Sequence, residues 1–158
     1  METEEVTMIT LDTIEIGSLP QGCLDGFKAY AAISDESQDM LASSMLTRAM
    51  LRVQEQADRS LLPCTFRLED DEVDGLVRLY QNIDQIVSVK DGNGQAIAWA
   101  RAGRTLSVGM VQSVVVEYTT KVQEGNVIDL LPVVYQYAAA LYDGQDSRTL
   151  ASILNQCR

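Results

Sequence analysis

Residues 45–69 read MLTRAMLRVQEQADRSLLPCTFRLE, and the spacing of the apolar side chains changes within this stretch. Up to residue 57 the apolar positions recur at steps of three and four, which is the period of an amphipathic helix. After Pro63 apolar and polar residues alternate, which is the period of a strand. Ser34 is a good N-cap, and no glycine or proline follows it before Pro63, so we predict a long helix over residues 35–59.

The predicted long helix carries one apolar stripe, which we expect to face the core. Its members are Leu41, Met45, Leu46, Ala49, Met50, Val53 and Ala57. The methionines at 40, 45 and 50 are interpreted as core packing rather than as an adaptable binding face. A shorter helix is predicted over residues 20–32, because Pro20 suits a first helical turn and apolar residues follow at helical spacing.

The section after Pro63 is predicted to be β-rich, with strands that pair as an antiparallel meander. Asp91-Gly92-Asn93-Gly94 tolerates the positive φ of a hairpin turn, and residues 113–119 have the strongest β-branched content. The predicted strands are 64–69, 83–90, 95–101, 105–108 and 113–119. Residues 1–18 hold no long periodic pattern and are compatible with a short strand or an arm.

The last part of the chain is predicted to be helical. Pro132 is expected to open a helix that ends near Tyr142, with Gly144 after it, and Asp146 is expected to cap a short helix from Ser147 to Gln156. Such a short helix is not stable alone, so it must dock, either on the chain's own long helix or on a partner. We favour the partner, because Gly144 and the polar residues 145–147 leave the segment free to swing. Its apolar side chains Leu150, Ile153 and Leu154 are therefore candidate partner-interface residues.

The predicted fold class is thus α+β: a long amphipathic helix plus an antiparallel β meander, closed by C-terminal helices. The predicted organisation is an N-terminal arm over 1–19, an α+β domain over 20–145 and a docking helix over 146–158.

The composition argues against several classes of function. The chain has 158 residues and a formal charge of −11, from 12 Lys+Arg against 23 Asp+Glu, which opposes binding to a phosphate backbone. It has no histidine, which removes the commonest general base and metal ligand, so an enzyme is not predicted.

The three cysteines are far apart and are interpreted as reduced thiols in a cytosolic compartment. We expect a soluble, unexported protein without a membrane span, since the first residues are acidic and no apolar run is long enough.

Local motifs give no catalytic, cofactor or metal site. Acidic residues at 70, 72 and 74 before Gly75 match the first half of a calcium loop, but Gln81 stands where the bidentate Glu belongs. The turn at 91–94 lacks the Lys and Ser/Thr of a phosphate loop. Arg101 and Arg104 flank Gly103 and are candidate contacts for a partner carboxylate or phosphate.

Several sequence segments, in the order in which they follow one another along the chain, resemble the head-tail connector or adaptor proteins of long-tailed bacteriophages. These segments are ADRSLLPCTFRL at 57–68, IDQIVSVKD at 83–91, VVVEYT at 114–119 and the apolar helix after Pro132. The resemblance covers residues from about 20 to 145. The chain departs from the family pattern at Asp58 and Thr120, where glycine is frequent, and at Tyr80, where proline is frequent.

The resemblance implies a structural virion protein in the neck between head and tail, assembled in the host cytoplasm. Its copies would form a cyclic, dodecameric ring beneath the portal protein, contact a stopper or tail-completion protein, and extend the channel through which DNA passes as cargo. A carboxylate-rich conduit would repel the DNA backbone. Two alternatives stay open: a soluble acidic binding module such as a DNA-mimicking inhibitor, and another virion stopper or completion protein.

Overall fold

The computed structural model describes residues 9–157. The chain forms two compact units. Of the described residues, the first unit contains 9–16 together with Pro63–Lys121, and the second contains Gly17–Leu62 together with 122–157. Two of the unit boundaries, between Leu62 and Pro63 and between Lys121 and Val122, lie within the predicted 20–145 domain, and the third follows Ile16. The α+β class is confirmed, since the first unit holds antiparallel strands and the second holds helices.

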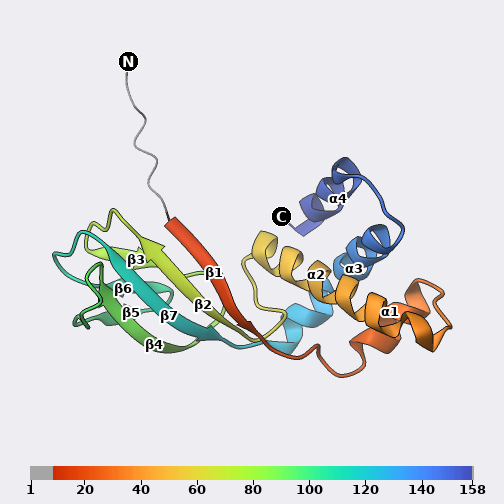
Figure 1. The fold of residues 1–158 in the computed structure, drawn as a ribbon, viewed down its shortest axis with the longest axis horizontal. Coiled ribbons are helices and arrows are strands. Elements are labelled where there is room, and N and C mark those ends of the chain that lie inside the picture. The colour runs from red at the N-terminus through yellow and green to blue at the C-terminus, as the bar shows by residue number, and fades with distance from the viewer. Residues whose placement is uncertain (1–8, 158) are drawn as a thin grey trace, which may run out of the picture. The chain divides into compact units, whose positions relative to one another are not determined.

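The first unit is built from two antiparallel sheets (Figure 1). The larger sheet has the order β1-β2-β7-β4, with bounds β1 Ile9–Ile16, β2 Cys64–Asp70, β7 Val114–Thr120 and β4 Ile83–Asp91. The smaller sheet has the order β3-β6-β5, with bounds β3 Leu76–Arg78, β6 Thr105–Ser107 and β5 Ala100–Ala102.

The core of the first unit follows from alternation along β2 and β7. Phe66 and Leu68 are buried and pair across the strands with buried Tyr118 and Val116. The rings of Phe66 and Tyr118 lie 5.7 Å apart. The phenol oxygen of Tyr118 accepts the N–H of Tyr80 at 3.2 Å and donates to its carbonyl at 3.3 Å, which ties the turn before β4 to the core.

The strands pair antiparallel as predicted, but they do not follow the sequential order of a meander. β7 lies between β2 and β4 because its alternate valines and Tyr118 complete the buried face of both neighbours. The predicted return strand over 95–101 is wrong. The chain pairs with β4 only near Lys90 and Ala96 before it leaves, and β5 pairs with β6 instead.

The second unit holds the helices. They are α1 Cys23–Tyr30, η1 Glu36–Gln38, α2 Asp39–Ala57, α3 Glu124–Tyr142, α4 Ser147–Leu154 and η2 Asn155–Cys157. The predicted short helix and long helix are both present. Asp35, rather than Ser34, caps the start of the long helical stretch, because its carboxylate accepts the N–H of Ser37 at 2.9 Å. Met50 is buried as predicted, whereas Met40 is 87% exposed, so its assignment to the core was wrong.

The helix α3 begins earlier than predicted. Pro132 does not open it but lies in its interior, and the helix starts at Glu124. Pro132 removes one backbone hydrogen bond. The helix continues because its buried face, which includes Leu130, Val134 and Tyr137, packs on the unit. Gly144 has a φ of 72° and follows the helix as predicted, with its N–H donating to the carbonyl of Leu141 at 3.1 Å.

No helix among residues 9–157 combines the length and the apolar character needed to cross a membrane.

Candidate functional site

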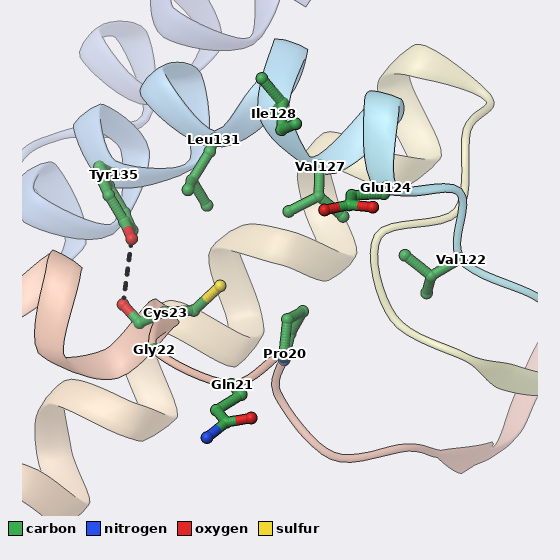
Figure 2. A pocket seen from close by; sticks show the side chains of 10 residues that line it. All are labelled: Pro20, Gln21, Gly22, Cys23, Val122, Glu124, Val127, Ile128, Leu131 and Tyr135. Carbon is green, nitrogen blue, oxygen red and sulfur yellow. Dashed lines mark hydrogen bonds between the residues drawn. The ribbon is translucent and has the colours of Figure 1, made fainter.

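An apolar groove of about 460 Å³ lies in the second unit, between the start of α1 and the first half of α3 (Figure 2). Apolar side chains dominate its lining, and these are Pro20, Val122, Val127, Ile128 and Leu131. Ile128 is 66% exposed, which is high for a large aliphatic side chain on a helix. The groove therefore offers an apolar surface that the rest of its own unit leaves uncovered.

Tyr135 fixes the end of the groove nearest to α1. Its hydroxyl donates to the carbonyl of Cys23 at 3.2 Å (Figure 2), and its ring lies 6.0 Å from that of Phe27. The same hydroxyl lies over Gly26, where an added Cβ would collide with it. A glycine in a helix is unfavourable by itself, so its presence here is explained by the close approach of the tyrosine.

The electrostatics of the groove do not favour acid–base or nucleophilic chemistry. Burial raises the pKa of the Cys23 thiol, so this group is protonated at neutral pH and is a poor nucleophile. Burial, together with the nearby Cys23, also raises the pKa of Tyr135. Glu124 is the one carboxylate in the lining, and it is exposed. The groove is suited to bind an apolar side chain, with a carboxylate available to a neighbouring cation.

The predicted interface residues of the C-terminal segment pack within the second unit. Asp146 caps α4 as predicted, since its carboxylate accepts the N–H of Thr149 at 2.9 Å. Ile153 and Leu154 are 5% and 8% exposed, and α4 lies against α3 and α2 (Figure 1). The sequence favoured docking on a partner, whereas in the structure α4 docks on the chain's own helices, because Ile153 and Leu154 are buried there. Leu150 is half-buried beside a hollow of about 350 Å³ that Arg48 and Arg52 also line.

The two predicted arginines, Arg101 and Arg104, lie in the first unit, whereas the α4 residues belong to the second. Arg101 is exposed on β5, and its Nε donates to the carbonyl of Gly103 at 2.8 Å, which fixes the side chain over the turn. Arg104 is half-buried, and its backbone carbonyl accepts the N–H of Leu79 at 2.7 Å.

The acidic stretch after β2 is a capped turn. The carboxylate of Asp70 is largely buried and accepts the N–H of Glu72 at 3.0 Å. In the part of the chain that the structure describes, no group of three or more Cys, Asp or Glu side chains is placed to hold a metal ion.

Comparison with known proteins gives a consistent structural match. A chain in the neck of an empty gene transfer agent (GTA) particle, solved with C6 symmetry, is similar with a TM-score of 0.64 and 14% identity, over 94% of this chain and 95% of that chain. A chain from the virion of the native GTA particle matches with a TM-score of 0.64, 15% identity and the same coverage. A third, from the neck of the native particle with C12 symmetry, has a TM-score of 0.61 and 14% identity over 94% of both chains.

This chain shares their fold. The similarity extends over both units, because it covers nearly the whole chain. No family model and no curated protein matches the sequence.

Sequence reasoning did not find the apolar groove. Its residues come from two segments that lie about a hundred positions apart, and the prediction that Pro132 starts the helix left residues 124–131 without a structure. One signal was present: Val127, Ile128 and Leu131 follow helical spacing ahead of Pro132, which extends the apolar pattern in the N-terminal direction.

Proposed function

We propose that this chain is a structural neck protein of a phage-like particle. Its copies form a ring beneath the portal, join the DNA-filled head to the tail, and extend the DNA channel. The observation that supports this most strongly is the similarity over 94% of the chain, at a TM-score of 0.64, to a chain in the neck of a GTA particle. The resemblance of the sequence to phage connector proteins rests on residues rather than on shape, and it points to the same role.

The chemistry of the described residues agrees with a non-enzymatic role. The chain contains no histidine, and burial keeps the Cys23 thiol in its protonated form. A charge of −11 suits a protein that DNA passes without adhering to it, since carboxylates repel phosphates.

Two surfaces are the leading candidates for contacts with neighbouring neck proteins. The first is the apolar groove with the exposed Ile128, and the second is the turn that carries Arg101 and Arg104. The first offers uncovered apolar surface, and the second carries the exposed Arg101, whose guanidinium group can pair with a carboxylate.

The oligomeric state tests the proposal. We expect native mass spectrometry and negative-stain micrographs of the purified protein, alone at high concentration or with its portal protein, to show closed rings. An Ile128→Lys variant should weaken binding to a partner, and Met40→Lys is a matched control because Met40 is also exposed on a helix of the same unit. A chain that stays monomeric at all concentrations and does not bind portal would contradict the proposal.

A further inference from the structure

The strand β1 is an edge strand whose apolar side chains are not covered. It pairs with β2 on one side and has no strand on the other in the described sheet (Figure 1). None of its eight residues is buried, and Ile9 and Ile16 are 48% and 46% exposed. Natural edge strands are commonly protected by charged residues, proline or a bulge. The sequence ITLDTIEI has no lysine or proline, and its protection is limited to Asp12, Glu15 and one bulge.

The apolar side chains of Ile9, Leu11 and Ile16 on β1 belong to the inner face of the sheet. Ile9 and Leu11 are register partners of Asp70 and Leu68 on β2, and both of those residues are buried. Residues that face each other across an antiparallel pair lie on the same face. The apolar face of the sheet therefore continues past β2 and ends, uncovered, at β1.

The opposite edge of the sheet has a complementary arrangement. β4 is the other edge strand, and hydrogen bonds from the following turn occupy only its last residues, through the N–H of Ile97 to the carbonyl of Val89 at 3.1 Å. On the inner face, Ile83 and Ile86 pair with Thr120 and Tyr118, both of which are buried. Ile83 is buried and Ile86 is half-buried, so the inner face is also apolar at this second edge.

Strand direction shows which pairing between copies a ring permits. Four antiparallel strands alternate in direction, so β1 and β4 of one chain run in opposite directions. When a second copy is placed beside the first in the same orientation, its β1 runs antiparallel to β4 and its inner face continues the first one. Such head-to-tail contact joins two different surfaces, as a cyclic ring requires, whereas β1 against β1 would give a twofold dimer.

We propose that β1 of one copy adds to the β4 edge of the next, near residues 83–88, and so extends the antiparallel sheet from subunit to subunit. This inference rests on the proposed ring. Main-chain hydrogen bonds would hold the two edges together, and Ile9, Leu11 and Ile16 would be covered by the inner face of the neighbour. The bulge between Thr13 and Glu15 divides β1 into two short paired stretches. It bends the strand and disfavours long, unlimited sheet growth.

Hydrogen exchange and paired lysine variants test this contact. The amides of β1 and of residues 83–88 should exchange at least ~10-fold more slowly in wild-type rings than in dilute monomer, while those of β2 and β7 change little. The double variant Ile9→Lys/Ile16→Lys should remain folded, since both positions are half-exposed, but should not form rings. The matched control is Leu76→Lys/Met110→Lys, at positions that are 62% and fully exposed in the same unit, and it should form rings.

The outcomes separate this inference from the proposed function. Rings formed by the β1 double variant, or β1 amides that exchange equally fast in ring and monomer, would overturn the strand-addition contact and leave the neck role intact. Protection of β1 without protection of residues 83–88 would overturn the choice of β4 as the partner edge. A wild-type chain that forms no ring at all removes the proposed function, and this contact with it.

Discussion

The side-chain oxygen of Gln54 accepts the backbone N–H of Leu62 at 3.1 Å, across the end of α2. The same oxygen accepts the N–H of Leu61 at 3.0 Å. Gln54 is 1% exposed and both leucines are fully buried. One side chain therefore satisfies two buried donors in the segment where the chain leaves its helix.

Replacing Gln54 by leucine should destabilise the protein strongly. The substitution keeps the volume but leaves two buried N–H groups without an acceptor, and we expect a loss of about 2–5 kcal/mol in the free energy of unfolding. Urea titration followed by circular dichroism measures the loss. Gln56→Leu, two positions along the same helix, is the control and should cost far less. An equal loss in both variants would show that the paired hydrogen bonds are not the cause.

Gly26 and Tyr135 should be energetically coupled. Gly26→Ala alone improves helix propensity but displaces the tyrosine hydroxyl from the carbonyl of Cys23. With Tyr135→Phe in the background the collision with the oxygen is gone, so the same glycine substitution should be more favourable by about 1 kcal/mol or more. A double-mutant cycle of unfolding free energies measures this coupling, and additive effects would refute it.

Ala32→Gly should stabilise the second unit. Ala32 has a φ of 57° and follows α1, with its N–H donating to Ala29 and the next N–H, that of Ile33, donating to Lys28. This is a Schellman motif with alanine where glycine is preferred. We expect a gain of about 0.5–1 kcal/mol, seen as a higher Tm. Ala29→Gly, inside α1, should have the opposite effect.

The cap of α4 should depend on pH. Hydrogen bonds from the Thr149 backbone to the carboxylate lower the pKa of Asp146 below its ordinary value of 3.8. A lowered folded-state pKa means that the contribution of the cap is complete above pH 3.8 and is lost as the pH falls through the folded value. Amide exchange or NMR shifts of Thr149 across pH 2–6 would show this. Asp146→Asn keeps a good cap but does not titrate, so its profile should be flat.

Removing residues 146–158 should lower stability. Ile153 and Leu154 are buried in the second unit, so their loss exposes the apolar surface of α2 and α3 that they cover. Leu154→Ala alone should cost about 2–5 kcal/mol. Arg148→Ala, at an exposed position on the same helix, should change stability little. An unchanged Tm after truncation would show that α4 is not held by its own unit in solution.

The sequence predicted the elements whose pattern is local. The period change around Pro63, the long helix, the cap at Asp146 and the glycine after α3 are all present, because each depends on residues within one or two turns. The strand order was not predictable in the same way. β7 inserts between β2 and β4 through contacts such as Phe66 with Tyr118, which are separated by about fifty residues, and no local rule ranks such pairings.

For the candidate sites, too, the local pattern was predictable and the contacts between distant segments were not. Leu150, Ile153 and Leu154 were correctly grouped on one side of a short helix, yet helical spacing cannot distinguish a face that covers its own unit from one that binds a partner. The groove escaped prediction for a related reason. Its walls come from α1 and α3, and the position of a proline suggested a later start for α3 than the packed helix has.

The chain passes from one unit to the other three times, after Ile16, Leu62 and Lys121. During synthesis, β1 leaves the ribosome long before its partner β2, because Ile9 pairs with Asp70. Since translation adds about 5–20 residues per second, the segment that forms β1 stays unpaired for several seconds before β2 is made. Non-local pairing of this kind also slows folding. The nascent chain is therefore most exposed to aggregation before residue 70 emerges, and expression at lower temperature or with a chaperone should raise the soluble yield.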